Sequence, residues 1–294
     1  MTEPIHLTGL MPRAALAAVR SALEAAGVPD APFDARELYR LAVGRDPRLD
    51  DTPLTADHAI RLAELTTRRA GREPLQYIAG KWDFLDFTLD VGPGVLCPRA
   101  DTEVVCEAAV ELLRGMNTSD PAVLDLCAGT GCLGLGIKRF VPGARVTCWE
   151  KSPEALPYLQ RNAVNALKGA EVAVREGDVL TGWRDVEPGS IDLIVSNPPY
   201  LTGAEMADLM PETAREPAMA LDGGDDGLLF YRCLTGPWQN ALRPGGWLVL
   251  EIGWQQRRAV LELGEQKRWV QGACRRDYGG NDRVILLRKP ADLG

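Results

Sequence analysis

The sequence predicts an α/β protein, in which a seven-stranded, mostly parallel sheet with an antiparallel last strand follows a small N-terminal helical bundle. Residues 1–80 contain few glycines and carry apolar side chains at helical spacing. Beyond residue 97, short β-rich runs alternate with helix-length segments, which is typical of a parallel sheet covered by helices on both faces. Only residues 275–282 separate the last two runs, too few for a parallel crossover, so these runs should pair antiparallel.

Composition and charge exclude several classes of protein. A length of 294 residues fits about two domains, and 46% hydrophobic with 25% charged residues is typical of a folded, soluble chain. The net charge of −8 lies almost wholly beyond residue 80 and argues against binding nucleic acid by neutralising its phosphates. The seven cysteines include no Cys-x-x-Cys pair, so we expect reduced thiols and no metal site. Without a signal-peptide core or an apolar run of about 18 residues, a cytoplasmic protein that binds no membrane is expected.

The elements can be placed in order along the chain. Apolar spacing predicts helices within residues 12–27, 34–43 and 57–69. We expect three parts, namely an N-terminal helical domain at 1–80, a β-hairpin linker at 81–96 and a sheet domain at 97–294. The strands of the sheet domain are expected at residues 122–127, 145–150, 171–175, 191–196, 247–252, 268–274 and 283–288.

A glycine-rich turn follows the first of these strands. The run Asp125-Leu126-Cys127-Ala128-Gly129-Thr130-Gly131 leads into a helix, and glycines without Cβ atoms let a ligand lie against the backbone. Gly129 to Gly134 matches G-x-G-x-x-G and Glu150 ends the next strand, so a dinucleotide site and a purely structural turn are both open interpretations. The register Asp-x-x-x-Gly-x-Gly resembles motif I of class I S-adenosylmethionine-dependent methyltransferases, which implies that Glu150 accepts hydrogen bonds from both ribose hydroxyls.

A second candidate segment, Gly177-Asp178-Val179-Leu180, follows the third strand. Asp178 would accept a hydrogen bond from the adenine amino group of such a cofactor, while Val179 and Leu180 cover the ring. The alternative is that Asp178 caps a helix.

The most informative segment is Asn197-Pro198-Pro199-Tyr200, at the end of the fourth strand. Its prolines fix φ and lack N–H groups, so the turn is rich in acceptors. The Asn197 side-chain oxygen and the Pro198 carbonyl can accept both hydrogens of a planar –NH2 group, with the Tyr200 ring against its plane. A proline-stopped strand without function is the alternative.

This arrangement suits methylation of an amide or an aromatic amine. The nitrogen lone pair is delocalised, so fixed acceptors must orient the group and stabilise the positive charge that develops on nitrogen during in-line methyl transfer. No strong base is required, which fits a chain whose only histidines, His6 and His58, lie outside the predicted site.

Further segments carry a family resemblance. Together with Asn-Pro-Pro-Tyr, and in this order along the chain, residues 74–80, 98–103, 216–228 and 243–246 resemble the protein-(glutamine-N5) methyltransferases, a class I methyltransferase family. Within it, the chain is most similar to the enzymes that modify the Gly-Gly-Gln loop of peptide chain release factors. Departures are mild: Cys127 and Ala128 replace the more common Gly and Thr, Ala100 replaces Pro, and Val179 stands where some members have an aromatic residue.

The resemblance implies methyl transfer from S-adenosylmethionine to the side-chain amide nitrogen of that glutamine, with the helical domain docking the protein substrate. It implies catalysis by Asn197, Pro198 and Tyr200, and a glutamine held by these residues and Pro199. Thr102 and Glu103 would line the methionine end or, alternatively, only begin a helix. The implied cofactor contacts are Cys127, Ala128, Gly129, Thr130, Gly131, Glu150, Asp178, Val179 and Asn197.

Other functions remain open at this stage. The same chemistry would serve a glutamine of a ribosomal protein, and adenine in DNA presents a similar amine, although the acidic balance disfavours direct nucleic-acid binding. A cofactor-binding module without catalysis, or a dinucleotide oxidoreductase, is the remaining alternative.

Overall fold

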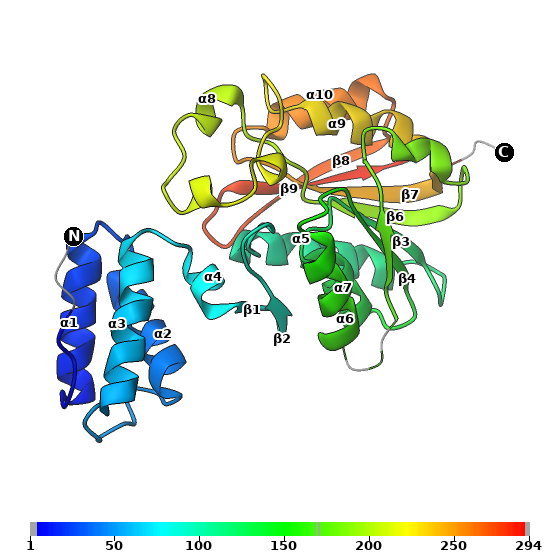
Figure 1. Cartoon of the computed structure of the whole chain (residues 1–294). Helices are drawn as coiled ribbons and strands as arrows, with labels where there is room; N and C mark the ends of the chain where they lie inside the picture. Colours follow the sequence, from blue (N-terminus) through cyan, green and yellow to red (C-terminus); the bar gives the residue numbers. More distant parts are fainter. Residues whose placement is uncertain (1–4, 168, 170, 292–294) are drawn as a thin grey trace. The chain divides into compact units, whose positions relative to one another are not determined.

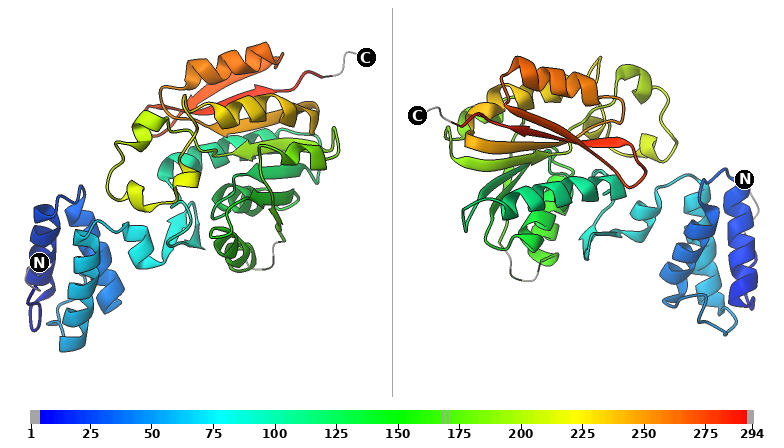
Figure 2. Two further views of the ribbon diagram at one scale, coloured as in Figure 1. Left: turned by 45° about the horizontal axis from the view of Figure 1, so that its top comes forward. Right: turned by 180° about the vertical axis from the view of Figure 1, so that it is seen from behind.

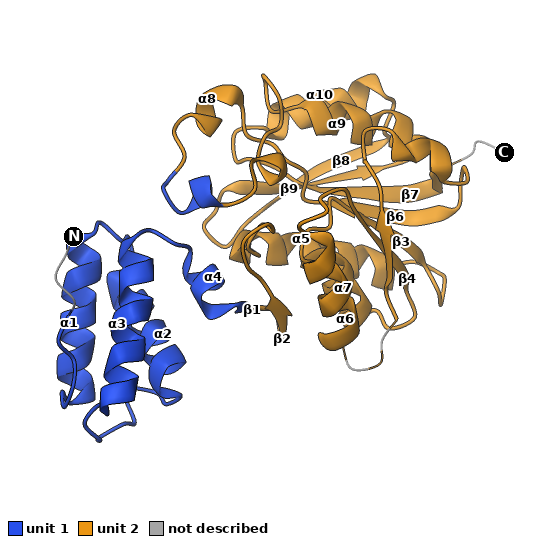
Figure 3. Ribbon diagram, in the orientation of Figure 1, with its two compact units in different colours: residues 1–81, 210–215 blue, residues 82–209, 216–294 orange. Residues whose placement is uncertain are grey.

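The computed structural model describes residues 5–167, 169 and 171–291, and the chain divides into two compact units (Figure 3). Unit 1 comprises residues 1–81 and 210–215, and unit 2 comprises residues 82–209 and 216–294. Unit 1 is therefore assembled from two separate stretches of the chain. In the part of the chain that the structure describes, no helix combines the length and the apolar character needed to cross a membrane.

Unit 1 is helical, and local sequence sets where its helices begin and end. Its elements are α1 (Pro12–Ala25), α2 (Ala31–Val43), α3 (Ala56–Ala70), α4 (Leu75–Ala79) and the 3-10 turn η2 (Thr213–Arg215). The Asp30 carboxylate and the Thr55 hydroxyl accept hydrogen bonds from backbone N–H groups in the first turns of α2 and α3. Gly44 ends α2 in the left-handed conformation. The apolar faces of these helices form the core of the unit, where Leu38 and Leu62 are fully buried.

A charged cluster attaches residues 210–215 to α2 and α3. The Arg69 side chain, only 6% exposed, donates to Asp34 at 2.6 Å and pairs with Glu212 at 2.8 Å. Arg72 binds the same Glu212 carboxylate through two hydrogen bonds of 2.6 Å each. Bidentate pairing of this kind fixes geometry as well as adding energy. The segment is held as part of the helical unit, although the chain before and after it belongs to unit 2.

The centre of unit 2 is a seven-stranded sheet with the order β5-β4-β3-β6-β7-β9-β8 (Figures 1 and 2). Its strands are β3 (Ala122–Leu126), β4 (Arg145–Glu150), β5 (Ala173–Glu176), β6 (Ile191–Ser196), β7 (Leu242–Glu251), β8 (Gln271–Arg276) and β9 (Asp282–Arg288). β9 pairs antiparallel with β7 and with β8, and the other pairs are parallel. The predicted mostly parallel sheet with an antiparallel last strand is confirmed. A separate hairpin of β1 (Lys81–Phe84) and β2 (Phe87–Asp90) precedes it in the chain.

Helices cover both faces of this sheet. They are α5 (Ala100–Arg114), α6 (Cys132–Phe140), α7 (Leu156–Asn165), α9 (Leu229–Thr235) and α10 (Arg257–Gln266), with the shorter α8 (Gly203–Met206), η1 (Gly182–Asp185), η3 (Ala218–Ala220) and η4 (Pro237–Asn240). Successive strand residues point to opposite faces. Val123 and Leu193 accordingly belong to the apolar cluster of α5, α6 and α7, and their neighbours Leu124 and Ile194 belong to that of α9 and α10.

Strand boundaries differ most from the expectation at β7 and β8. β7 begins at Leu242 instead of residue 247, because Leu242 already pairs with Ile191 before a shift in register. β8 begins at Gln271 instead of residue 268, because the preceding residues still close α10. Arg268 has a positive φ of 61°, and the Trp269 N–H donates to the Gly264 carbonyl oxygen.

Candidate active site

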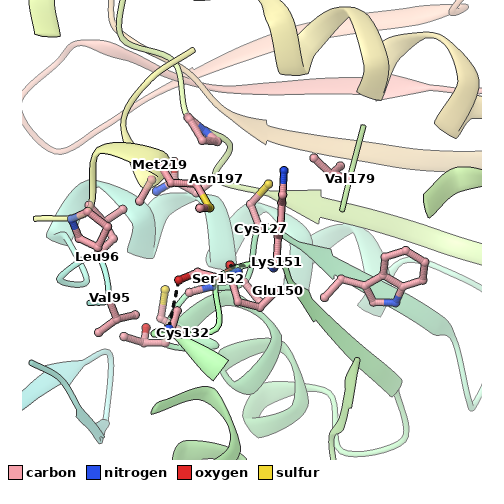
Figure 4. Close-up of a pocket in the computed structure, with 18 of the residues that line it drawn as sticks. Val95, Leu96, Cys127, Cys132, Glu150, Lys151, Ser152, Val179, Asn197 and Met219 are labelled. Atoms are coloured by element: carbon pink, nitrogen blue, oxygen red, sulfur yellow. Dashed lines mark hydrogen bonds between the residues drawn. The ribbon is translucent and has the colours of Figure 1, made fainter. Parts of the chain in front are cut away.

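A cavity in unit 2 lies where the parallel strands end (Figure 4). The ends of β3, β4, β5 and β6 lead directly into four of its walls, which are residues 127–130, 150–152, 177–180, and Asn197 with Pro199. The rest of the lining comes from residues 94–98, from Thr102 at the start of α5, and from Cys132, Leu133, Trp149, Ala155, Pro217, Met219, Ala220 and Phe230. Ligands of open α/β sheets bind at this edge, so the topology brings segments that are distant in sequence to one ligand-sized site.

Three residues of the glycine-rich turn after β3 have positive φ, a conformation that glycine adopts freely and cysteine rarely. Cys127, Gly129 and Gly131 have φ of 61°, 56° and 84°. A Cβ on Gly131 would lie 2.6 Å from Cδ1 of Leu159, so a larger residue would displace the packing of α7. Gly131 therefore serves the shape of the turn, while residues 127–130 provide its surface toward the cavity.

Asp125 supports this turn through a hydrogen bond to the helix that follows it. Its side chain is buried, and Oδ2 accepts a hydrogen bond from the Gly134 N–H at 2.8 Å, in the first turn of α6. Burial raises the pKa of Asp125 to about 7, against the opposing effect of the Gly134 hydrogen bond. The first residue of the Asp-x-x-x-Gly-x-Gly register thus supports the turn and lies outside the lining of the cavity.

Glu150 ties the turn to the loop after β4. Its Oε2 accepts from the Gly129 N–H at 2.7 Å, and its Oε1 accepts from the N–H groups of Lys151 at 2.8 Å and Ser152 at 2.7 Å. A carboxylate offers roughly four acceptor positions, and the three backbone N–H groups already use most of them. The two hydroxyls of a ribose would therefore have to share a position with one of these N–H groups. The side chain is at once a support of the turn and an acceptor in the wall of the cavity.

Asp178 and Val179 follow β5. Asp178 accepts from the Leu180 N–H at 2.9 Å and pairs with Lys151 Nζ at 2.9 Å. Burial raises the pKa of Asp178, but the hydrogen bonds from Lys151 and Leu180 outweigh it, so the net pKa is lowered and the group is an ionised acceptor. The carbonyl oxygen of the buried Val179 accepts from Trp238 Nε1 at 2.7 Å, which fixes the segment. Lys151 was missed by the sequence reasoning and places a cation beside the predicted adenine acceptor.

The Asn-Pro-Pro-Tyr turn is held in place at both ends. Ser196, the last residue of β6, donates from Oγ to the Leu126 carbonyl oxygen at 2.6 Å. At the other end, Gln256 Nε2 donates to the carbonyl oxygen of Tyr200 at 2.9 Å. Burial raises the pKa of Tyr200 to about 12, so its hydroxyl is neutral at physiological pH. The position of the turn is thus determined by contacts with neighbouring strands and loops.

Most of the predicted site residues meet at this cavity. Those in its lining are Cys127, Ala128, Gly129, Thr130, Glu150, Asp178, Val179, Leu180, Asn197, Pro199 and Thr102. Gly131, Pro198 and Tyr200 adjoin lining residues in the chain without lining the cavity themselves. Glu103 accepts a hydrogen bond from the Leu85 N–H at 2.8 Å and does not line the cavity.

Two buried carboxylates near the site were not predicted. Glu251, at the end of β7, accepts a hydrogen bond from Thr102 Oγ1 at 2.7 Å. Glu216 accepts from Arg99 at 2.5 Å and from the Cys97 N–H at 3.3 Å, and so joins two segments of the cavity wall. A signal for Glu251 was present, because it follows an apolar run just as Glu150 does at the end of β4.

In comparisons with known proteins, two different families match the N-terminal part of the chain and the part that follows it. Residues 14–80 match the family described as the PrmC N-terminal domain, and residues 100–225 match the methyltransferase small domain. The release factor glutamine methyltransferase of Streptomyces coelicolor is 38% identical over 266 residues, which cover 90% of this chain and 93% of the relative. That of Deinococcus radiodurans is 36% identical over 271 residues, covering 91% of this chain and 94% of the relative.

Solved structures share the fold. A methyltransferase from Pyrococcus furiosus superposes with a TM-score of 0.52 at 18% identity, over 70% of this chain and 91% of that one. A release factor-specific protein-(glutamine-N5) methyltransferase from Alicyclobacillus acidocaldarius gives a TM-score of 0.43 at 27% identity, over 68% of this chain and 99% of that one. The sheet described above is that of a class I methyltransferase.

Proposed function

The chain belongs to the release factor glutamine methyltransferase family, and on this premise we propose that it methylates N5 of the glutamine in the Gly-Gly-Gln motif of a peptide chain release factor. We infer that the methyl donor is S-adenosylmethionine, because residues 100–225 match the methyltransferase small domain and the sheet is of the class I type. One observation carries the assignment of the reacting end of the site: Asn197 lines the cavity at the end of β6, in a turn that neighbouring segments hold in place. Because the proposed substrate acts in translation, we infer that the reaction takes place in the cytoplasm.

The cavity fits the proposed donor. S-adenosylmethionine would lie against residues 127–130 with Gly131 shaping the turn, Glu150 toward its ribose, and Asp178 with Val179 around its adenine. Gly129 has no Cβ, and the space where one would lie contains a single atom within 4 Å, at 3.9 Å. A ligand therefore has room against the backbone of the turn. When bound, the donor supplies a methyl group activated by a positively charged sulfur.

The turn would then prepare the amide nitrogen. Asn197 Oδ1 and the Pro198 carbonyl oxygen accept the two amide hydrogens, Pro199 keeps the backbone rigid, and the Tyr200 ring lies against the amide plane. These acceptors orient a poor nucleophile and stabilise the positive charge that develops on nitrogen as the C–N bond forms. The alkylated nitrogen is acidic and loses one proton to an acceptor or to water, so the absence of histidine from the described lining presents no difficulty.

The substrate assignment follows the relatives reported above, which are named release factor glutamine methyltransferases. Neither a ribosomal protein nor DNA adenine is favoured by an observation of this structure. The helical domain predicted at residues 1–80 is proposed to dock the protein substrate, a role consistent with its separate match to the PrmC N-terminal domain.

The test is mass spectrometry of a folded release factor after incubation with the full-length enzyme and S-adenosylmethionine. We expect the Gly-Gly-Gln peptide to gain the mass of one methyl group, and Asn197→Ala to abolish the gain. A ribosomal protein and duplex DNA, assayed in parallel, should remain unmodified. Absence of modification of the release factor at saturating donor would overturn the proposal.

A further inference from the structure

A buried chain of hydrogen bonds leads from the catalytic turn into the sheet. Asn197 Nδ2 donates to Thr102 Oγ1 at 3.4 Å, and Thr102 Oγ1 donates to Glu251 Oε2 at 2.7 Å. The three residues come from the ends of β6 and β7 and from the first turn of α5. Thr102 is 1% exposed and Glu251 is 2% exposed, so water does not compete for the hydrogen bond between them.

The direction of this chain is fixed by the chemistry of its members. While Glu251 is ionised, its carboxylate only accepts hydrogen bonds, so the single hydroxyl hydrogen of Thr102 points to Glu251. Thr102 Oγ1 can then only accept a hydrogen bond from Asn197. The donor must be the NH2 group of the Asn197 side chain. The oxygen Oδ1 of Asn197 is left for the cavity.

We propose that Thr102 and Glu251 are positioning residues, which orient the Asn197 side chain so that its oxygen, and not its amino group, faces the substrate amide. The proposal rests on the proposed function, because it concerns how that reaction is prepared. If Asn197 turned over, its NH2 group would face the NH2 group of glutamine, donor against donor. The nucleophilic nitrogen would then lose one of the two acceptors that orient it.

The local structure offers no simpler reason for this arrangement. Thr102 lies at the third position of α5 and gives its hydroxyl to a distant strand, since Glu251 is 149 residues further along the chain. A buried carboxylate is costly unless hydrogen-bonded. Glu251 occupies such a position at the end of β7, directly beside β6, the strand that Asn197 follows.

Ionisation of Glu251 provides a readout of the proposal. Burial raises the pKa of Glu251 to about 7, against the hydrogen bond from Thr102 and the charge of Arg283. Below that pH, protonated Glu251 donates to Thr102, whose hydroxyl hydrogen can then turn to Asn197 and reverse the amide. The titratable and charged groups around Glu251 are Asp101 on α5, Arg99 before it, Cys132 on α6, Tyr200 in the turn, Tyr231 on α9 and Arg283 on β9.

The experiment compares Thr102→Val, which keeps the shape and removes the hydroxyl, with Thr102→Ser, which keeps the hydroxyl. At saturating donor, we expect kcat for the release factor to fall by up to about 100-fold in T102V and to stay within about threefold of wild type in T102S. Wild-type kcat should fall as pH decreases through about 7, and T102V should lack this dependence. Equal kcat values and equal pH profiles in the two variants would overturn the proposal.

A second measurement separates this inference from the proposed function. The Asn197 side-chain N–H signals, observed by NMR in the enzyme without substrate, should exchange with solvent faster in T102V than in wild type or T102S. This readout does not depend on which substrate is methylated. Equal exchange in all three proteins overturns the orienting role, whereas slow exchange lost only in T102V supports it even where the release factor proves not to be the substrate.

Discussion

Arg99 donates a hydrogen bond to Glu216 at 2.5 Å, across 117 residues of sequence, and so links residues 94–98 of the cavity lining to the segment that contributes Pro217, Met219 and Ala220. The same Glu216 carboxylate accepts from the Cys97 N–H. One buried side chain therefore positions the loop before α5 against the segment that contributes Met219 to the lining.

Loss of this link should weaken donor binding. In Glu216→Ala, the Cys97 N–H and Arg99 both lose their acceptor, and we expect the Kd for S-adenosylmethionine to rise about tenfold, as for one buried polar group left unpaired. Glu216→Gln is the matched control, because it retains an acceptor and should have a smaller effect. Isothermal titration calorimetry measures both. An unchanged Kd in the alanine variant would contradict a role for this link in shaping the cavity.

Removal of Glu212 should destabilise the helical unit. Glu212→Ala leaves Arg72 without its bidentate partner and Arg69 with Asp34 alone, so the free energy of opening α3 should fall by about 2–3 kcal/mol, less than for a fully buried pair. Glu24→Ala removes the exposed pair with Arg20 in the same unit and should change it by less than about 0.5 kcal/mol. Hydrogen exchange of peptides from α3, followed by mass spectrometry, compares the two. Equal protection in both variants would show that Glu212 stabilises the helical unit no more than the exposed Glu24 does.

The same carboxylate predicts a pH dependence. Burial raises the pKa of Glu212, but hydrogen bonds from Arg72 and Arg69 outweigh it and lower the pKa from 4.5 to about 2. Because the pKa is lower in the folded state, the stabilisation is complete above pH 4.5 and is lost as pH falls toward 2. The protection of α3 from hydrogen exchange should therefore decrease as the pH falls across this range in the wild type, and should decrease less in Glu212→Gln. Parallel curves for the two proteins would exclude Glu212 as the titrating group.

A pair of glycine substitutions isolates the packing of the glycine turn. Gly131 and Gly189 have φ of 84° and 71°, but a Cβ would lie 2.6 Å from Leu159 at Gly131 and would meet nothing within 4 Å at Gly189. Gly189→Ala should cost about 1–2 kcal/mol of stability from backbone strain alone. Gly131→Ala should cost about 2–4 kcal/mol, because overpacking adds to that strain. Urea unfolding gives both values, and equal costs would mean that α7 moves freely to admit the methyl group.

The features that could be predicted from the sequence are those set by short runs of neighbouring residues. The glycine turn and the Asn-Pro-Pro-Tyr turn are each a short run in which residue type dictates backbone conformation and exposed chemistry. Both follow apolar strands, and parallel topology brings strand ends together. Their meeting at one cavity was therefore predictable, as was the antiparallel last strand from the short segment before it.

What could not be predicted depends on side chains that meet only after folding. Thr102 and Glu251 are separated by 149 residues, and Arg72 and Glu212 by 140 residues. No periodicity or turn preference links such positions. The start of β7 was missed for a related reason, since its first residue is paired only through a register shift against β6.

The path of the chain through residues 210–215 limits how the protein can be dissected. Between residues 209 and 216 the polypeptide leaves the methyltransferase unit, contributes Glu212 to the helical unit and returns. A fragment cut after residue 81 would lack that carboxylate, and the complementary fragment would carry it with no arginine from α3 to neutralise it. A fusion of two separate domains through a single linker would therefore not reproduce this arrangement. A graft of the helical unit onto another methyltransferase would have to include the six residues 210–215 as well.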